Sequence, residues 1–276
     1  MRTLTLEDLC IHQICLWKQC GFVESLDCLA RHGITKTAIW RPMLEEVGIQ
    51  KAITAMRVTG VSAISICPLV LYDPENPLDR QSQREQNLKC LEEAAELGVL
   101  SVVTITGGLN SVYNNIPAAR EAAVEELSRL IPKARKLGLL IALEPLHPMV
   151  CGMRSVVSTV DEACEILDAL DSDDVLRLAL DTYAVWWDGQ LQSQILQVGD
   201  RISNFHVSDW LLDTRDLRLD RGMPGDGLID NALIRSWVEE AGFSGPVEVE
   251  IFSERDWWLK PPDTVVEAIC KRLPIL

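Results

Sequence analysis

Short apolar runs rich in β-branched residues alternate with amphipathic stretches along the whole chain. The runs are typical of buried strands, and the stretches between them have the longer spacing of helices. The predicted strands are Cys10–Leu16, Thr37–Trp40, Val61–Cys67, Leu100–Thr106, Leu139–Pro145, Leu176–Tyr183, Ile202–Ser208 and Pro246–Ser253. The predicted helices are Gln81–Leu97, Ala118–Leu137, Thr159–Leu170, Asp230–Ala241 and Asp263–Leu273.

The order of these elements predicts repeated βα units in a single domain over residues 1–276. Helices that end at Gly98 and Gly138 lead directly into apolar strands, as expected of such units. Eight units fit either a closed (β/α)8 TIM barrel or a doubly wound sheet. A doubly wound sheet usually has a glycine fingerprint after its first strand. Here residues 17–22 contain one glycine, which favours the α/β TIM barrel.

Charge and composition narrow the functional classes. The chain has 26 Lys and Arg against 41 Asp and Glu, a net charge of −15, which disfavours a nucleic acid or an anionic membrane as partner. No apolar run approaches the ~20 residues of a membrane span, and the N-terminus does not resemble a signal peptide. Nine cysteines without a CxxC pair are typical of reduced thiols, so we expect a cytoplasmic protein.

Side-chain alternation predicts a polar cluster at one end of the barrel. In the eighth strand Val247 and Val249 suit the helix layer, so Glu248 and Glu250 face the axis. The same alternation turns one more polar residue inward from each of the fifth, sixth and seventh strands, namely Glu144, Asp181 and His206. Active sites of TIM barrels lie at the C-terminal ends of the strands, where these residues fall.

Three carboxylates and an imidazole would be an unstable group without a cation. Burial raises carboxyl pKa values, and like charges repel, whereas a divalent ion removes both conflicts. Oxygen-rich ligation with one nitrogen suits Mn²⁺ best, with Mg²⁺, Co²⁺ or Zn²⁺ as alternatives. The sequence therefore predicts one divalent metal ion at Glu144, Asp181, His206 and Glu250.

Around these residues the chain resembles the sugar phosphate isomerase/epimerase family, the xylose isomerase-like barrels that include D-tagatose 3-epimerase-like enzymes. The similar segments are ALEPLHP (142–148), LALDTYAVWWD (178–188), NFHVSDW (204–210) and VEVEIFS (247–253). The resemblance implies the same four metal ligands, with Glu144 and Glu250 as the catalytic acid/base pair. PGDG (224–227) matches a further family loop, and Arg221 before it fits an arginine that holds substrate oxygens, although residues 211–220 form an insertion.

Two departures from the family fall on the substrate side of the site. Ala184 stands where epimerase-like members usually have a histidine, and Val150 where they often have an acidic residue. His147 offers a replacement proton-transfer or substrate-binding group, the alternative being a loop histidine bonded to the backbone. No lysine-rich or arginine-rich pocket is obvious from the sequence.

Tryptophans near the predicted mouth suggest further substrate contacts. Trp186 follows the sixth strand and Trp258 the eighth, while Trp40 ends the second. Aromatic faces suit the C–H faces of sugars, but such residues also cap cores or form contacts in a homo-oligomer. Thr106–Gly107–Gly108 ends the fourth strand and is either a substrate contact or a turn.

The main hypothesis is therefore a metal-dependent isomerase or epimerase of a small carbohydrate, a ketose or related polyhydroxy carbonyl compound, that acts through an enediolate. The alternative enzyme is a lyase or dehydratase that eliminates a group β to the enediolate of a keto-sugar. An endonuclease IV-like nuclease is disfavoured by the charge and by only four histidines. A non-catalytic barrel that binds a ligand or a partner subunit is disfavoured by the complete quartet, since loss of activity would have allowed a charged inward residue to be lost.

Overall fold

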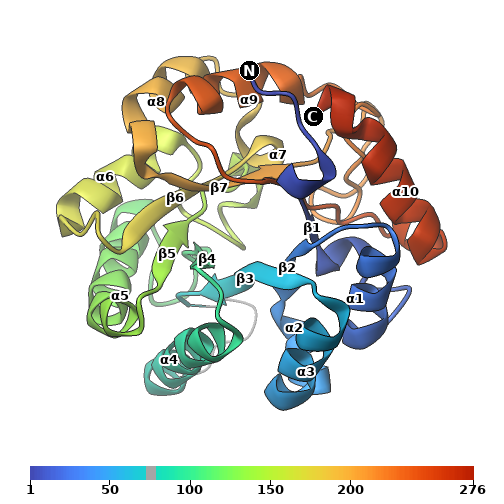
Figure 1. Ribbon diagram of the computed structural model, residues 1–276. Helices are drawn as coiled ribbons and strands as arrows, with labels where there is room; N and C mark the ends of the chain where they lie inside the picture. Colours follow the sequence, from blue (N-terminus) through green and yellow to red (C-terminus); the bar gives the residue numbers. More distant parts are fainter. Residues whose placement is uncertain (73–78) are drawn as a thin grey trace.

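The computed structural model describes residues 1–72 and 79–276, and within them eight parallel strands close into a barrel in sequence order. Figure 1 looks along the barrel, with the strands at the centre and the helices around them. The strands are β1 (Leu9–His12), β2 (Lys36–Trp40), β3 (Ser62–Val70), β4 (Ser101–Ile105), β5 (Leu140–Leu143), β6 (Leu176–Asp181), β7 (Ile202–Val207) and β8 (Val247–Val249). The predicted α/β TIM barrel is confirmed.

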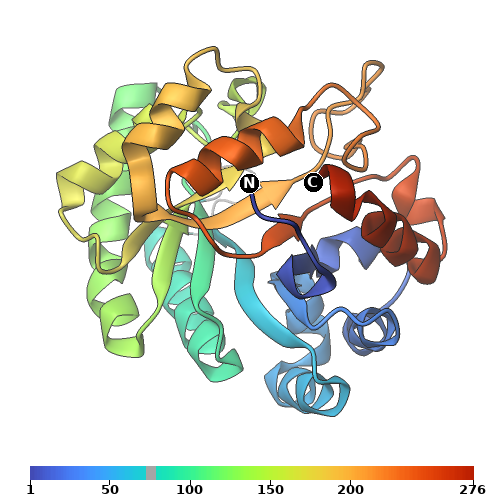
Figure 2. The same ribbon diagram turned by 45° about the horizontal axis from the view of Figure 1, so that its top comes forward.

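Helices surround the barrel and cover the outward faces of the strands (Figure 2). They are α1 (Phe22–Arg31), α2 (Arg41–Val47), α3 (Ile49–Thr59), α4 (Arg80–Leu97), α5 (Ile116–Leu137), α6 (Val160–Leu170), α7 (Thr182–Val185), α8 (Leu191–Val198), α9 (Asn231–Glu240) and α10 (Pro262–Arg272). Among the described residues no helix has the length and apolarity to cross a bilayer.

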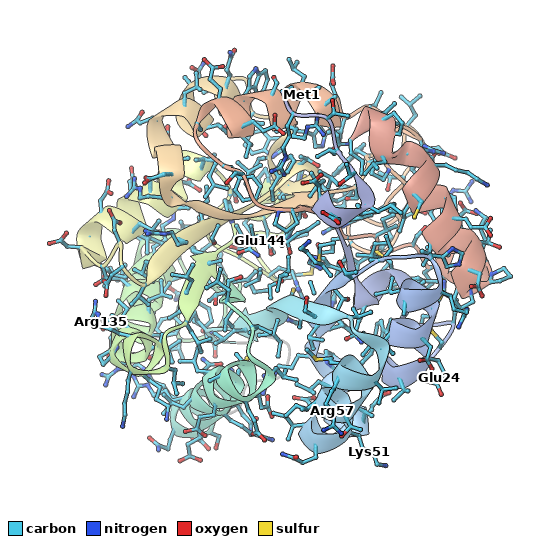
Figure 3. The ribbon with its side chains drawn as sticks, in the orientation of Figure 1. Met1, Glu24, Lys51, Arg57, Arg135 and Glu144 are labelled. Carbon is cyan, nitrogen blue, oxygen red and sulfur yellow. The ribbon has the colours of Figure 1, made fainter. Side chains whose placement is uncertain are left out.

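Most strand residues are buried whichever way their side chains point, which explains the near-continuous apolar runs in the sequence. Outward-facing Phe205 and Ile39 are fully buried in the core beneath the helices. The axis holds the polar residues instead: Figure 3 shows Glu144 near the middle of the ring, while Glu24 and Arg135 lie outside it. The strand pattern thus positions the polar cluster at the axis.

Several strands end earlier in the sequence than predicted. The predicted strand Cys10–Leu16 is wrong beyond His12, because residues 13–16 form a 3-10 helix. The predicted range Pro246–Ser253 contains β8 over three residues only, Val247–Val249. Residues that leave the ladder early can turn over the barrel end, and Glu250 and Phe252, which follow β8, line a pocket there.

Candidate active site

Four consecutive strands bring the predicted quartet together. Glu144 directly follows β5, Asp181 ends β6, His206 lies in β7 and Glu250 directly follows β8. All four side chains are buried. Nδ1 of His206 lies 3.0 Å from Oε1 of Glu144. The predicted inward orientation is therefore confirmed.

Backbone pairing fixes these positions. Asp181 and His206 are Cα partners between β6 and β7. The ladder continues one step past β5 and β8, since the Glu144 amide donates to Thr104 (2.9 Å) and the Glu250 amide to Val207 (3.1 Å). The quartet thus stands on strand backbone, which positions side chains more rigidly than a loop would.

A second pair, His12 and Glu248, lies in direct contact with the quartet. Nε2 of His12 lies 3.1 Å from Oε2 of Glu248, and its Nδ1 lies 3.3 Å from Oε1 of Glu250. Burial would lower the pKa of both His12 and His206, but their glutamate neighbours outweigh it and raise the pKa of each. Burial likewise would raise the pKa of Glu248, yet the histidines lower it to about 2.

His12 was not singled out from the sequence. Alternation along β1 would have identified it: Cys10 pairs in register with the inward Glu248, and His12, two residues later, faces the same side as Cys10. Glu248, in contrast, was predicted to face inward and does so.

Arg221 places a fixed cation against the carboxylates. Its Nη1 lies 2.9 Å from Oδ2 of Asp181 and 3.1 Å from Oε2 of Glu250. Burial raises the pKa of Asp181 despite this arginine. Burial would also raise the pKa of Glu250, but the hydrogen bond from His12 and the charge of Arg221 lower it.

The PGDG loop explains how Arg221 reaches the axis. The Arg221 amide donates to Phe252 (2.8 Å), and the next residue, Gly222, pairs with Asp209 in an antiparallel bridge. Asp209 also accepts hydrogen bonds from the amides of Gly225 and Ile229. A Cβ at Gly227 would lie 2.1 Å from the Trp210 carbonyl oxygen, so this close turn requires glycine.

The donor set fits a divalent cation. Ligand atoms of Glu144, His206 and Glu250 all lie within 4.8 Å of one another. Two ligands held at about 2.1 Å on one ion lie about 3 Å apart, matching the separation between His206 and Glu144. Burial raises the pKa of Glu144, so a cation would relieve the cost of its ionised form. Asp181 lies outside this group of three, and its carboxylate contacts Arg221 and accepts a hydrogen bond from the Tyr183 amide.

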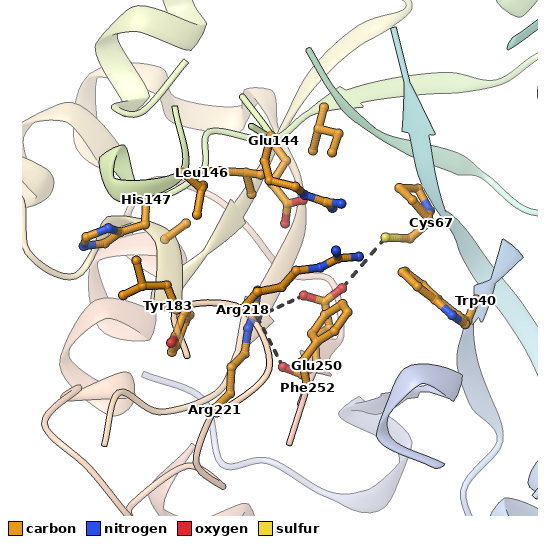
Figure 4. Close-up of a pocket in the computed structure, with 16 residues that line it drawn as sticks. Trp40, Cys67, Glu144, Leu146, His147, Tyr183, Arg218, Arg221, Glu250 and Phe252 are labelled. Atoms are coloured by element: carbon orange, nitrogen blue, oxygen red, sulfur yellow. Dashed lines mark hydrogen bonds and ion pairs between the residues drawn. The ribbon is translucent and has the colours of Figure 1, made fainter. Parts of the chain in front are cut away.

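A pocket opens above these residues (Figure 4). Glu144, Glu250, Arg221 and His147 line it. Further lining comes from Trp40, Cys67, Pro68, Ile105, Leu146, Val150, Arg154, Tyr183, Ala184, Leu217, Arg218 and Phe252. The departures Val150 and Ala184 therefore make two positions of the wall apolar.

His147 is both a pocket residue and a loop histidine bonded to the backbone, the two alternatives considered for it. It lines the pocket, and its Nδ1 accepts a hydrogen bond from the Met149 amide at 3.3 Å. Partial burial lowers the pKa of His147, which favours its neutral form. Its ring packs against Trp210, with centroids 4.8 Å apart.

The structure does not bring Trp186 or Trp258 into this pocket. Trp186 lines a separate hollow with residues of α8 and α9. Trp258 is buried, and its indole N–H donates to the Ile14 carbonyl at 2.8 Å. Trp40 is the tryptophan among the pocket-lining residues, close to Phe252 with ring centroids 5.5 Å apart.

The chain has relatives among proteins of known sequence. Inosose isomerase of Bacillus velezensis is 24% identical over 277 residues, which cover 94% of this chain and 94% of that protein. Inosose isomerase of Bacillus subtilis (strain 168) is 30% identical over 157 residues, 54% of this chain and 53% of that protein. The chain thus spans about half the length of the second relative. The prediction of an isomerase agrees with both.

Solved structures share the whole fold. A crystal structure of a protein from Sinorhizobium meliloti 1021 has a TM-score of 0.91 at 38% identity and covers 97% of this chain and 98% of that one. The IolI protein with a bound zinc atom has a TM-score of 0.81 at 22% identity and covers 95% of each chain. The sequence profile of the xylose isomerase-like TIM barrels matches residues 25–273. The protein belongs to this family of xylose isomerase-like TIM barrels.

Proposed function

We propose that the protein is a divalent-metal-dependent isomerase or epimerase of a ketose or related polyhydroxy carbonyl compound. One observation carries the proposal: Glu144 and Glu250 line one pocket, and their carboxylates share a cluster with His206. The curated inosose isomerases, whose name states an action on a polyhydroxy ketone, support the same class of substrate.

The two glutamates are suited to proton transfer. They come from β5 and β8, on different sides of the barrel. One carboxylate can take a proton from the carbon beside the carbonyl group, and the other can return it to the opposite face, which is epimerisation. If one carboxylate moves the proton between neighbouring carbons, the result is aldose–ketose isomerisation.

Glu144, His206 and Glu250 would hold the metal, with Asp181 as fourth ligand if it exchanges its contact with Arg221. A bound ion would supply Lewis acidity, which would stabilise the negative charge that develops when the proton beside the carbonyl group is removed. Mn²⁺ is the proposed ion, with Mg²⁺, Co²⁺ or Zn²⁺ as alternatives, and the zinc atom in IolI supports a divalent site in such a barrel. Arg221 stays charged beside the site, since Asp181 and Glu250 raise its pKa despite burial.

Three aromatic residues contribute apolar surface to the pocket wall. Trp40, Tyr183 and Phe252 line the pocket around Glu250. Their apolar faces suit the C–H groups of a sugar and lower the local dielectric constant, which strengthens each charged contact.

The test combines metal content with substrate-proton exchange. Mass spectrometry of the purified protein should find about one divalent ion per chain, and Glu144→Gln and His206→Ala should lose it. With the ion bound, ketoses in D₂O should take up deuterium at the carbon beside the carbonyl without a smaller product. Release of a fragment would identify the lyase instead, while a bound metal without exchange on a broad panel would indicate a binding barrel.

A further inference from the structure

A cluster of possible metal ligands lies outside the barrel mouth, between α1 and α10. Because β1 pairs with β8, the helices that follow these two strands are neighbours on the outside of the barrel (Figure 1). Cys28 lies in α1, His32 is the residue that ends this helix, and Asp263 lies in the first turn of α10. The cluster therefore joins the first α-helix of the chain to the last one.

The three side chains meet at one carboxylate oxygen. Nε2 of His32 lies 2.9 Å from Oδ1 of Asp263, and Sγ of Cys28 lies 3.7 Å from the same oxygen. The ligand atoms of all three residues lie within 4.8 Å of one another. On a tetrahedral Zn²⁺, nitrogen and oxygen ligands lie about 3.3 Å apart, and sulfur and oxygen ligands about 3.5 Å apart. Small movements of the side chains would therefore place these atoms around one ion.

The helix itself prepares the cluster for a cation. Cys28 and His32 are four residues apart, a spacing that places two side chains on the same face of a helix. The carbonyl groups at the C-terminal end of α1 carry partial negative charge, which favours a positive ion beside His32. Cys28 is buried, whereas the side chain of Asp263 is half exposed. The cluster thus has a buried side that holds the thiol and an open side through which an ion can enter.

Arg31 contacts the same carboxylate and is compatible with a bound ion. Its Nη2 lies 2.9 Å from Oδ1 and 3.0 Å from Oδ2 of Asp263. A carboxylate can accept on both oxygens, so Oδ2 can keep its bond from Arg31 while Oδ1 binds a metal. Carboxylates that ligate metals commonly accept such a second hydrogen bond, which orients them. The hydrogen bonds from Arg31 and His32 also lower the pKa of Asp263, which keeps the carboxylate ionised at neutral pH.

A cysteine, a histidine and an aspartate in contact could also form a hydrolytic triad, but the environment of the thiol does not suit a nucleophile. Burial, together with the charge of Asp263, raises the pKa of the Cys28 thiol to about 12. The thiol donates its hydrogen bond to Asp263. A buried, protonated thiol is inert as a nucleophile, whereas a metal ion can displace its proton and use the sulfur as a ligand. The cluster is therefore better suited to metal binding than to catalysis.

We propose that Cys28, His32 and Asp263 form a second metal site, which binds Zn²⁺ and links α1 to α10. Thiolate and imidazole ligands favour Zn²⁺ over Mn²⁺ or Mg²⁺, and three protein ligands leave the fourth tetrahedral position to water. On binding, a Zn–S bond replaces the S–H bond of Cys28, and the proton passes to solvent. Because the ion must displace this proton and share Asp263 with Arg31, the site fills when Zn²⁺ is supplied, in addition to the ion proposed at the mouth. The inference does not depend on the isomerase function.

Cobalt spectroscopy distinguishes this site from the mouth. Co²⁺ bound to a thiolate has a near-ultraviolet charge-transfer band that carboxylate and imidazole ligands do not produce. Co²⁺ added to the protein should give this band, and Zn²⁺ should abolish it by displacing the Co²⁺. The band should be lost in Cys28→Ser, while His32→Gln and Asp263→Asn should each weaken Zn²⁺ binding by at least about 10-fold in the same competition. Cys270→Ser is the matched control and should keep the band, since Cys270 is a partly buried thiol of α10 outside the cluster.

Thermal unfolding is the second readout, measured on His206→Ala so that the mouth does not contribute. Added Zn²⁺ should raise the Tm of this variant, and Cys28→Ser in the same background should remove the increase.

Three outcomes would overturn the proposal. The first is the absence of a thiolate band. The second is a band that survives Cys28→Ser and disappears in Cys67→Ser, which would place the thiolate at the mouth beside Glu250. The third is a band that needs Cys28 but is unaffected by both His32→Gln and Asp263→Asn, which would indicate a lone thiol that binds Co²⁺. A protein that shows the expected band but exchanges no ketose would support this site and contradict the isomerase.

Discussion

Buried carboxylates occur in two contrasting regions of this protein, the barrel mouth and the seam between α4 and α5. At the mouth, His12, His206 and Arg221 contact four carboxylates, those of Glu144, Asp181, Glu248 and Glu250. At the seam, the buried Glu126 and its exposed neighbour Glu125 both contact Arg80 and Arg84. The Glu126 carboxylate contacts Arg84 at 2.7 and 2.9 Å and Arg80 at 3.0 Å.

The pKa values of the buried carboxyl groups differ between the two regions, and this difference distinguishes a carboxylate that stabilises the fold from carboxylates suited to chemistry. At the seam, burial would raise the pKa of Glu126, but the hydrogen bonds from Arg84 and Arg80 outweigh burial and lower that pKa. At the mouth, burial raises the pKa values of Glu144 and Asp181 despite their cationic neighbours. A fold has no structural need for a cluster of buried carboxyl groups with raised pKa values, and this observation supports the proposal that the mouth binds a cation and a substrate.

The largest expected effect comes from Glu250→Gln. This change keeps the shape of the side chain but removes its negative charge, so it removes both a proposed metal ligand and a proposed base. We expect isomerase turnover to fall by at least about 1000-fold, with a loss of bound metal. Deuterium exchange and metal analysis are the measurements. Glu254→Gln, an exposed glutamate four residues later, is the control, and unchanged activity in Glu250→Gln would refute the catalytic assignment.

Arg221→Met should have the next largest effect, on stability as well as activity. It leaves Asp181 and Glu250 buried without their shared cation, and loss of one partner of a buried ion pair costs about 3–5 kcal/mol. We expect the free energy of unfolding from urea titration of the metal-free protein to fall by about 3 kcal/mol. Saturating Mn²⁺ should restore part of it if the ion binds the same carboxylates. A variant as stable as the wild type would show that Arg221 is not needed for charge balance.

The sequence predicted the barrel because strand-like runs and helical stretches alternate along the chain, and it predicted the inward quartet because strand side chains have a period of two. Strand residues alternate faces wherever the backbone stays extended, and Glu144 and Glu250 keep that alternation one step beyond their strands. The last strand was predicted to extend several residues too far, yet the predicted orientation of Glu250 was still correct.

The substrate side could not be predicted in the same way, because it consists of loops. Arg154 and Arg218 lie in segments without periodicity, and their places depend on close backbone contacts and turns. Trp258 follows a strand as a mouth residue would, yet the chain folds back and buries its indole against Ile14. Such tertiary contacts leave no spacing signal in one sequence.

A smaller effect is expected from His12→Gln. His12 contacts both Glu248 and Glu250 and touches no pocket space, so it is a positioning residue. We expect kcat to fall by about 10- to 100-fold with a modest change in KM, as for other groups that orient metal-site ligands. Ser65→Ala removes a hydrogen bond to Glu248 alone, at 3.3 Å, and should change kcat less. Equal losses in the two variants would place the effect on Glu248 rather than on Glu250.

The smallest effect tests the seam and is independent of catalysis. Glu126→Gln replaces charge-assisted hydrogen bonds by neutral ones, and we expect a loss of about 1–2 kcal/mol in unfolding free energy at pH 7 with turnover unchanged. Because folding lowers the pKa of Glu126, its contribution is complete above its unfolded pKa near 4.3 and declines as the pH falls through the folded value. The difference between wild type and variant should therefore shrink in acid. Glu125→Gln, an exposed neighbour that contacts the same arginines, should have a smaller effect. A difference for Glu126→Gln that is independent of pH would show that packing of the side chain, and not its charge, joins the two helices.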